Sequence, residues 1–323
     1  MSDFRINAEQ IETAAATLRD GGLVAFPTET VYGLGADATN ATAVAKIFDA
    51  KDRPRFDPII VHLADAGDLE TVTTSVSPLA DLLARTFWPG PLTMVLPRGE
   101  TIPPIVSAGL PTVGVRVPDH PVATQLIQLA DRPIAAPSAN RFGRISPTTA
   151  AHVSGQLAEH LDGILDGGPC RIGVESTVVD LTGPRPRLLR HGGVTHEQLQ
   201  EVVGPVEIHR GTQPVDQAAP APGMLARHYA PNTPIVLVAD PPSEPPGPRA
   251  GLLSLTRPGS TDGWARIEVL SETGDLVEAT AGFFAALHRL DDAELEQIVA
   301  QGFPETGLGV ALNNRLERAA AQA

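Results

Sequence analysis

Six prolines between residues 204 and 234 divide this chain of 323 residues into two unequal parts. Proline lacks the backbone N–H donor and its ring fixes φ, so a segment this rich in proline continues neither a helix nor a central strand. Apolar periodicity is absent from the same segment and regular on both sides of it. We therefore expect a first domain over residues 1–203, a proline-rich linker over 204–234 and a small second domain over 235–323.

Helix-like and strand-like patterns alternate along both domains. In the first domain we expect helices over 7–20, 42–49, 78–87, 121–130 and 195–202, and strands over 23–26, 59–63, 93–96, 113–117, 134–136 and 177–181. In the second domain we expect strands over 235–239, 251–255, 267–270 and 295–300, and helices over 276–290 and 308–321. This alternation predicts an α/β or α+β class, with a mixed sheet and flanking helices in the first domain and a small α/β domain after the linker.

The composition excludes several classes of protein. The chain has 38 acidic and 24 basic residues, and the resulting net charge of −14 disfavours a general nucleic-acid-binding protein, which needs a basic face. The single cysteine, Cys170, leaves no internal disulfide and no cysteine-based zinc site. No apolar run approaches the roughly 20 residues that span a membrane, and the amino terminus lacks the pattern of a signal peptide. We expect a cytoplasmic protein without a membrane partner.

A polar turn follows the first expected strand. Its sequence over residues 27–35, Pro-Thr-Glu-Thr-Val-Tyr-Gly-Leu-Gly, brings hydroxyls, a carboxylate and glycines together where backbone can approach a ligand. A structural turn whose hydroxyls bond to backbone explains the same residues. Both interpretations stay open on this segment alone.

Charged residues cluster between the second expected helix and the second expected strand. Lys51, Arg53 and Arg55 alternate there with Asp52 and Asp57. The helix dipole alone favours cations at a helix C-terminus. The functional interpretation is a phosphate site, with lysine as a point charge and arginine as a planar fork. Because the chain has no glycine-rich loop ending in Gly-Lys-Ser or Gly-Lys-Thr, any nucleotide is held in another way.

An arginine lies inside the fourth expected strand. By strand alternation Val113, Val115 and Val117 face one side, and Gly114 and Arg116 face the other. An arginine beside a glycine indicates a carboxylate or phosphate ligand that reaches the sheet. A solvent-exposed arginine on an edge strand is the alternative.

Small polar residues and one arginine lie near the ends of other expected strands. They are Ser138, Asn140, Ser146, Ser176 and Arg190. Small side chains leave room for a ligand, and hydroxyls can bind phosphate oxygens. Of nine histidines only His62 lies in an expected strand beside these segments. The sequence has no histidine pair with metalloprotease spacing and no Gly-x-Ser-x-Gly elbow, so hydrolytic metal or serine chemistry has no support.

Taken in order, these segments closely resemble the YrdC-domain family, and in particular its long two-domain members, the threonylcarbamoyl-AMP synthases of tRNA modification. The matching segments are residues 27–34, 51–54, 89–93, 114–118, 137–140 and 176–180. The linker sequence at 228–231, His-Tyr-Ala-Pro, and the sequence at 314–316, Asn-Arg-Leu, resemble the second domain of the long form. The resemblance implies a YrdC-like twisted mixed sheet around a deep cavity, followed by a Rossmann-like domain.

The resemblance also implies a reaction, in which L-threonine, bicarbonate and ATP give L-threonylcarbamoyl-AMP and pyrophosphate. The enzyme would be a nucleotidyltransferase, EC 2.7.7.87, whose product passes to a tRNA threonylcarbamoyl transferase system as downstream partner. The threonine-binding residues carried over from the family are Thr30, His62, Arg116, Ala136 and Ser176. The ATP-binding residues carried over are Arg53, Asp57, Thr112, Ser138, Ser146, Arg190 and Tyr229, with Lys51 and Arg53 as the catalytic cations.

The residues suit this chemistry, because a carbamate that attacks the α-phosphorus of ATP needs cations and alignment rather than a protein nucleophile. Magnesium is expected to arrive with ATP and to bridge its phosphate oxygens with few protein ligands, without a dedicated metal site or a tightly bound organic cofactor. The family usually has asparagine where this chain has Asp57. A carboxylate there repels a triphosphate unless magnesium, Arg53 or Arg55 neutralises it.

Two other functions fit parts of this sequence. A YrdC-fold module for double-stranded RNA or ribosome maturation is disfavoured by the acidic charge and the scarcity of lysine, so we expect no stable nucleic-acid binding. A carbamoyltransferase of hydrogenase maturation would carry cysteine-pair zinc fingers, which one cysteine excludes.

In the linker, Tyr229 beside His228 and Arg227 predicts a lid over the loaded cavity. An anchor between linker and second domain is the alternative.

Overall fold

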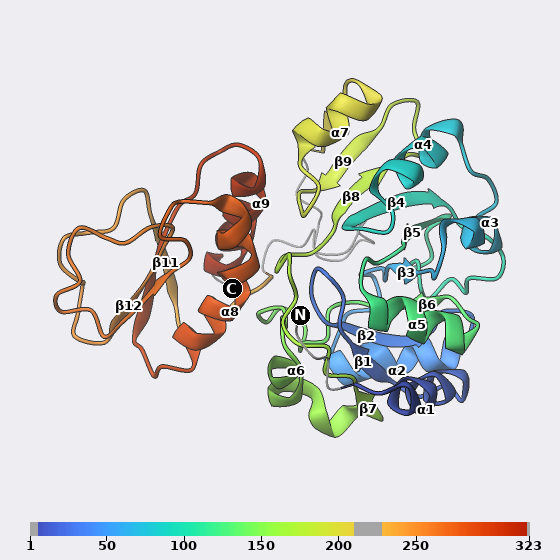
Figure 1. Cartoon of the computed structure of the whole chain (residues 1–323), viewed down its shortest axis with the longest axis horizontal. Helices are drawn as coiled ribbons and strands as arrows, with labels where there is room; N and C mark the ends of the chain where they lie inside the picture. Colours follow the sequence, from blue (N-terminus) through green and yellow to red (C-terminus); the bar gives the residue numbers. More distant parts are fainter. Residues whose placement is uncertain (1–5, 210–227, 322–323) are drawn as a thin grey trace.

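The computed structural model describes residues 6–209 and 228–321, and in these residues helices pack around two sheets (Figure 1). Within the described chain the first sheet has ten strands, in the order β10-β9-β8-β4-β5-β3-β6-β2-β1-β7. The second has four parallel strands, in the order β11-β14-β12-β13. A mixed sheet followed by a small parallel sheet is the α/β architecture that the sequence predicts.

The strands of the first sheet are β1 (Val24–Phe26), β2 (Gly33–Asp37), β3 (Val61–His62), β4 (Leu92–Pro97), β5 (Thr112–Arg116), β6 (Ile134–Ala135), β7 (Gly163–Ile164), β8 (Thr177–Asp180), β9 (Arg187–Arg190) and β10 (Glu207–Ile208). The helices around it are α1 (Ala8–Arg19), α2 (Ala41–Lys51), α3 (Leu69–Val72), α4 (Pro78–Phe87), α5 (Pro121–Ala130), α6 (Ala150–Leu157) and α7 (His196–Val203). The second sheet contains β11 (Ile235–Val238), β12 (Ala250–Ser254), β13 (Arg266–Val269) and β14 (Gln297–Gln301), with helices α8 (Leu276–Asp291) and α9 (Leu308–Ala320).

Each helix and strand range predicted from the sequence contains an element of the predicted type. One local prediction is wrong, because residues 33–35, assigned to a turn, begin the strand β2 between β1 and β6. This strand has no β-branched residue, and its glycines let it lie against the ring of Phe26. A Cβ at Gly35 would lie 2.8 Å from that ring. Pairing with its neighbours, rather than local propensity, makes this segment a strand. The elements α3, α6, β7, β9 and β10 were not predicted either.

The order of strands brings polar side chains together at the ends of neighbouring central strands of the first sheet. Strands β3 and β5 run parallel, and their register sets His62 opposite Arg116 at the C-terminal ends of both strands. Strand β5 lies between β4 and β3, so Arg116 is not on an edge strand and that alternative is wrong. Strand β4 runs parallel to β8, with Leu92 opposite Thr177. The start of β8 therefore lies close to these strand ends.

The second domain packs on the first through α8 and α9, which lie on the side of the second sheet that faces the first domain (Figure 1). Phe283 of α8 shares one apolar cluster with Val174 and Tyr229. Gly173, with φ +79°, allows a close approach, because a Cβ there would lie 2.4 Å from the carbonyl oxygen of Thr280. The junction is therefore a packed apolar core.

The predicted linker is only partly described. Strand β10 falls inside the range 204–234 and pairs with β9 of the first sheet, whereas residues 210–227 of the linker and lid lie outside the described residues. From His228 onward the chain runs along the loop before α6, where the backbone N–H of Ala230 donates to the carbonyl of Gly143 at 2.8 Å. The domain boundaries stay a prediction. In the described ranges no helix has the length and apolar character needed to cross a membrane.

Candidate functional site

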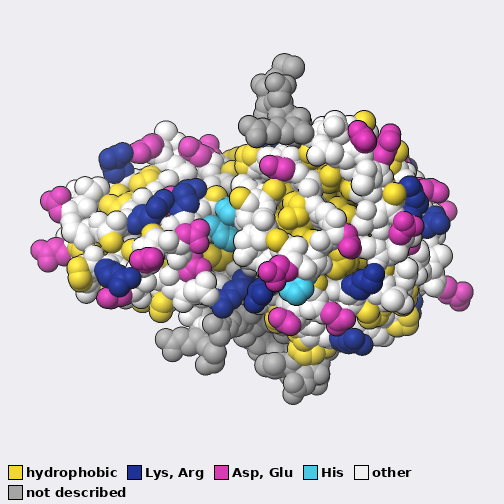
Figure 2. Space-filling model, turned by 90° about the horizontal axis from the view of Figure 1, so that it is seen from below, with side chains coloured by type: hydrophobic (Ala, Val, Ile, Leu, Met, Phe, Trp, Pro, Cys, Tyr) yellow, Lys and Arg dark blue, Asp and Glu magenta, His cyan; other side chains and the backbone are white. Residues whose placement is uncertain are grey.

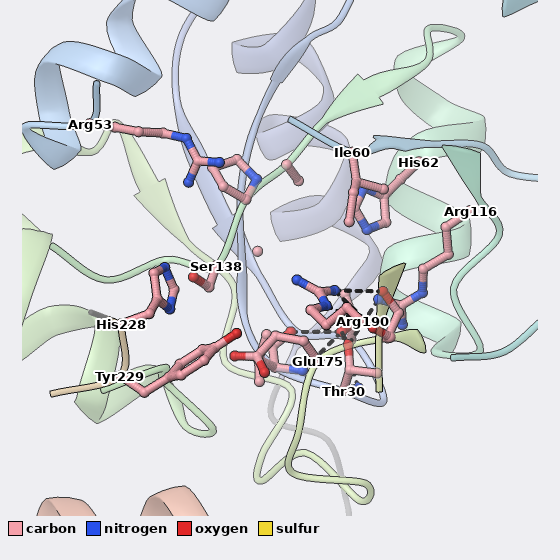
Figure 3. Close-up of a pocket in the computed structure, with 16 residues that line it drawn as sticks. Thr30, Arg53, Ile60, His62, Arg116, Ser138, Glu175, Arg190, His228 and Tyr229 are labelled. Carbon is pink, nitrogen blue, oxygen red and sulfur yellow. Dashed lines mark hydrogen bonds between the residues drawn. The ribbon is translucent and has the colours of Figure 1, made fainter. Parts of the chain in front are cut away.

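A cavity of about 50 Å³ lies near the C-terminal ends of the central strands β3, β5 and β6 and the start of β8 (Figure 3). The side chains and backbone that line it are Thr28, Thr30, Val31, Gly33, Arg53, Ile60, His62, Arg116, Ala136, Pro137, Ser138, Glu175, Ser176, Arg190, His228 and Tyr229. Three arginines against one glutamate give the wall a positive balance, which suits an anionic ligand.

Arg116 is held in a fixed position at the floor of the cavity. Its Nη2 atom lies 2.6 Å from the Oε1 atom of Glu29, and both side chains are buried. The Nη1 atom donates to the hydroxyl of Thr30 at 2.9 Å, and Nε donates to the carbonyl of Gly90 at 3.2 Å. The Thr30 hydroxyl also lies 2.8 Å from that of Thr28. The polar turn therefore acts both as local structure and as the support of a cationic site.

His62 presents a neutral ring to the same side of the cavity. Burial, together with the charge of Arg116, lowers the pKa of His62 to about 3. The ring stands edge-on to Phe26, with centroids 6.3 Å apart. Among the described residues its Nδ1 atom has no hydrogen-bond partner. An unprotonated imidazole nitrogen beside a guanidinium can accept a hydrogen bond from a ligand hydroxyl or amine.

Arg190 fixes the start of β8. Its Nε and Nη2 atoms donate to the carbonyl of Ser176 at 3.1 and 2.9 Å, and Nη2 also reaches the Ser176 hydroxyl at 3.1 Å. That hydroxyl lies 2.8 Å from the hydroxyl of Thr93 on β4. Gly192 makes this packing possible, since a Cβ there would lie 2.3 Å from the carbonyl oxygen of Glu175.

Arg53 reaches the cavity from the segment after α2, and Asp57 neutralises part of its charge. Its Nη2 atom lies 2.9 Å from the Oδ2 atom of Asp57 and donates to the carbonyl of Pro58 at 2.7 Å. Burial raises the pKa of Asp57, and the nearby Arg53 and Lys51 oppose that rise. Asp57 itself does not line the cavity. Its carboxylate therefore faces the guanidinium rather than a ligand.

Lys51 lies behind the cavity wall and not on it. Its ammonium donates to the carbonyl of Ser138 at 2.7 Å and to the carbonyl of Asn140. Burial and the charge of Arg53 lower the pKa of Lys51 well below its ordinary value. We expected Lys51 to reach a phosphate. In the described structure it instead holds the backbone on which Ser138 is mounted.

Tyr229 closes the cavity on the side of the second domain, with its hydroxyl directed inward (Figure 3). The residue has φ +65°, a left-handed conformation that is rare for an aromatic residue and is often found at functional sites. Its ring packs against His228, with centroids 4.1 Å apart. Within the described part of the chain the Tyr229 hydroxyl has no hydrogen-bond partner. Burial raises its pKa, so it is a neutral donor.

Glu175 is the acidic residue in the wall. Its Oε1 atom accepts a hydrogen bond from the hydroxyl of Ser146 at 2.5 Å, and its Oε2 atom lies 3.0 Å from Nη2 of Arg315 on α9. Burial raises the pKa of the Cys170 thiol, so the one cysteine is not a thiolate nucleophile. The arrangement offers cations and hydroxyls for binding and alignment, and no activated nucleophile among the described residues.

The structure brings most of the predicted site residues together. Nine of them line the cavity: Thr30, Arg53, His62, Arg116, Ala136, Ser138, Ser176, Arg190 and Tyr229. Lys51, Asp57 and Ser146 each lie one contact behind it. Thr112 is not brought to the cavity, because it begins β5 whereas Arg116 ends that strand.

Sequence reasoning missed four residues of the site and its support. Glu175 and Glu29 stood in quoted motifs without an assigned role, and His228 was noted only as a neighbour of Tyr229. An acidic residue directly before a predicted ligand residue was the available signal for both glutamates. Arg315 gave no such signal, because it is 140 positions away from its partner Glu175.

Comparisons with known proteins identify the family. A family model described as "Telomere recombination", covering the Sua5, YciO and YrdC proteins, matches residues 16–192. A second, described as "Threonylcarbamoyl-AMP synthase, C-terminal domain", matches residues 194–321. The chain belongs to the two-domain threonylcarbamoyl-AMP synthases of the YrdC-domain family.

Full-length relatives agree with this family. The threonylcarbamoyl-AMP synthase of Bacillus subtilis is 43% identical over 98% of this chain and 95% of its own length. That of Pyrococcus abyssi is 44% identical over the same shares of the two chains. A crystal structure of P. abyssi Sua5 complexed with L-threonine superposes with a TM-score of 0.90, at 42% identity, over 98% of this chain and 95% of that one. These synthases are enzymes, and the YrdC-like and Rossmann-like folds expected from the resemblance are those of the family.

Proposed function

We propose that this enzyme joins L-threonine, bicarbonate and ATP into L-threonylcarbamoyl-AMP and releases pyrophosphate, as the nucleotidyltransferase of EC 2.7.7.87. One observation carries the proposal. A polar group made by Thr30, His62 and Arg116 and a cationic group made by Arg53 and Arg190 line the same cavity. Two substrates that must react with each other need such a shared space.

Threonine would occupy the half around Arg116. The guanidinium would bind the α-carboxylate, while neutral His62 and the Thr30 hydroxyl would bind the amine or side-chain hydroxyl. The backbone of Ala136 and the hydroxyl of Ser176 complete this half of the wall. The complex of P. abyssi Sua5 with L-threonine supports threonine as the substrate by similarity.

ATP would occupy the half between Arg53 and Arg190. Their guanidinium groups would offset the phosphate charge, with hydroxyls of Ser138 and Tyr229 as donors. The described residues contain no group of three or more histidine, cysteine or acidic side chains that could hold a metal. Magnesium, which the family resemblance implies, would therefore be carried by the phosphate oxygens and water, and would supply charge neutralisation there.

The proposed chemistry needs alignment more than it needs a protein nucleophile. Bicarbonate takes up a proton and loses water to give carbon dioxide. The neutral threonine amine attacks the carbon of carbon dioxide and loses a proton to solvent, which gives a carbamate. A carbamate oxygen then attacks the α-phosphorus, the bond to the β-phosphate oxygen breaks, and pyrophosphate leaves. The arginines reduce the repulsion between the two anions.

A nucleotide enters only if the walls separate. A cavity of about 50 Å³ is far smaller than the ~300–1,000 Å³ of ligand pockets. The backbone strain at Tyr229 and its unpartnered hydroxyl favour the wall around Tyr229 as the part that moves. The lid predicted from the sequence therefore stays a proposal, and it rests on Tyr229, which lies in the described part of the chain.

The product would pass to a tRNA threonylcarbamoyl transferase system, since a carbamoyl adenylate is an activated donor and not an end product. The face drawn in Figure 2 carries small groups of arginine and lysine separated by acidic side chains. Together with the net charge of −14, this pattern supports a small-molecule enzyme without stable nucleic-acid binding.

Pyrophosphate release measured with each of the twenty amino acids tests the proposal. We expect release with threonine, in the presence of bicarbonate, to exceed release with valine and serine, which lack the hydroxyl or the methyl group. Equal release with all three would overturn the assignment of the Arg116 half to threonine.

A further inference from the structure

Arg315 of α9 is the largest fully buried side chain in the described part of the molecule. A buried guanidinium is stable only where counter-charges and acceptors surround it. Apart from the carbonyl of Ala311, one turn earlier in α9, those partners lie outside its own domain. Its Nε and Nη2 atoms each lie 3.0 Å from Oε2 of Glu175, and Nη1 donates to the carbonyl of His191 at 2.5 Å. Its guanidinium carbon lies 5.4 Å from the ring centroid of Tyr229.

These three partners all lead to the same half of the cavity. Glu175 accepts the hydrogen bond from Ser146, one of the predicted ATP-binding residues. His191 directly follows Arg190, a second predicted ATP-binding residue. Tyr229 is a third, and its hydroxyl is directed into the cavity (Figure 3).

The threonine half is supported by other groups. Arg116 is held by Glu29, Thr30 and Gly90, all from the first domain. No contact between Arg315 and Thr30, His62 or Arg116 is present among the described residues. The two halves meet at Ser176, whose carbonyl and hydroxyl accept hydrogen bonds from Arg190. Arg116 is supported from the first domain, whereas Glu175, Tyr229 and the backbone beside Arg190 contact Arg315 of the second domain.

We infer that Arg315 is a positioning residue for the nucleotide, through which the second domain sets the affinity of the enzyme for ATP. The inference rests on the proposed function, because it takes the Arg53–Arg190 half as the ATP site. A simpler role is to fasten the two domains together. That role predicts a loss of stability and equal effects on both substrates, whereas the positioning role predicts a selective effect on ATP.

Calorimetric titration of ATP and of threonine against matched variants separates the two roles. Arg315→Met removes the support, and Arg289→Met is the control. Arg289 also pairs with a glutamate, Glu268, with Nη2 and Oε2 2.5 Å apart, but its side chain is half exposed and the pair lies inside the second domain, away from the cavity. We expect Arg315→Met to raise the Kd for ATP roughly tenfold or more, with the Kd for threonine changed less than about threefold. The control should change neither Kd beyond about twofold, within the range of an exposed pair.

Two further variants keep the test decisive. Arg315→Lys retains the charge without the planar fork, so it should fold and still raise the Kd for ATP about threefold. It decides the matter if Arg315→Met does not fold. Glu175→Gln combined with Arg315→Met removes the stranded buried carboxylate, and should restore part of the ATP affinity lost in Arg315→Met alone.

The outcomes are distinguishable. If the unaltered enzyme binds no ATP, the proposed function fails. If it binds ATP and the Arg315 variants bind ATP as tightly, or lose ATP and threonine affinity in equal measure, the inference about Arg315 is overturned. A selective loss of ATP affinity, partly restored by the double substitution, supports it.

Discussion

The carboxylate of Glu29 lies 2.6 Å from the guanidinium of Arg116, and solvent reaches almost none of either side chain. An arginine paired in this way keeps its position before any ligand arrives. A guanidinium has five N–H donors, and the contacts of Arg116 with Glu29, Thr30 and Gly90 do not use all of them. Donors therefore remain for a ligand. The ion pair therefore prepares Arg116 to bind a second carboxylate at little further cost in conformational entropy.

The first prediction concerns Arg116→Ala. Losing a charge-assisted contact to a desolvated carboxylate costs about 2–5 kcal/mol, so the Kd for threonine should rise roughly thirtyfold or more. The Kd for ATP should change by much less, because Arg53 and Arg190, and not Arg116, are the arginines of the proposed ATP half. Calorimetry on both ligands measures this difference. Unchanged threonine affinity would reduce Arg116 to a structural role.

The second prediction concerns the ion pair between Arg53 and Asp57. Asp57→Asn keeps the shape of the side chain and removes a negative charge beside the proposed phosphate site. We expect the Kd for ATP to fall about threefold, because Arg53 keeps its bonds to the backbone carbonyls and gains net charge toward the ligand. Weaker ATP binding by Asp57→Asn would mean that the carboxylate holds Arg53 or magnesium in a productive position.

The third prediction separates the hydroxyl of Tyr229 from its ring. Tyr229→Phe removes one neutral donor and should raise the Kd for ATP about fivefold. Tyr229→Ala also removes the ring over which Arg315 lies, and should raise the Kd further and increase the loss of intermediate to hydrolysis. Circular dichroism checks that both variants fold. Equal ATP affinity in both variants and the unaltered enzyme would leave Tyr229 as an anchor of the linker.

The fourth prediction concerns the pH dependence of stability, and it rests on a stacked histidine pair at the domain junction. The rings of His152 and His288 lie 3.9 Å apart, and burial with the charge of His288 lowers the pKa of His152 to about 4. The unfolded chain takes up this proton as the pH falls below about 6.5, whereas the folded chain does so only near 4. Stability that is fully present above pH 6.5 is therefore lost as the pH falls toward 4.

His152→Asn tests this pH dependence, since Asn keeps an acceptor near Thr148 and cannot be protonated. Urea unfolding at pH 7.5 and pH 5.0 should show that the variant loses about 1 kcal/mol less than the unaltered protein, after allowance for the partial exposure of the ring. Identical losses in both proteins would show that the pair does not contribute. His62 and His191 add to the acid sensitivity in the same direction, because their pKa values are also lowered, to about 3 and about 4.

The sequence predicted the parts of this molecule that local chemistry decides. Regular apolar patterns located α1 and α8, and strand alternation placed Gly114 and Arg116 on one face of β5. It failed where tertiary contacts decide, as in β2, whose glycines become a strand only because Phe26 and the neighbouring strands lie against it.

The site shows the same division. The family resemblance pointed to motif residues such as Thr30 and Ser176, and both line the cavity. The placement of Thr112 away from the cavity, of Lys51 behind Ser138 and of Arg315 against Glu175 depends on strand direction and domain packing. A list of residues along the chain contains neither.

The most direct test of the central claim is to identify the nucleotide products when ATP is supplied with threonine and carbon-13 bicarbonate. We predict pyrophosphate and an AMP-containing product in equal amounts, formed only when threonine and bicarbonate are both present. The product should carry the bicarbonate carbon, seen as the corresponding mass shift. ADP and inorganic phosphate, or pyrophosphate release that needs neither threonine nor bicarbonate, would contradict the claim that this cavity adenylates a threonine carbamate.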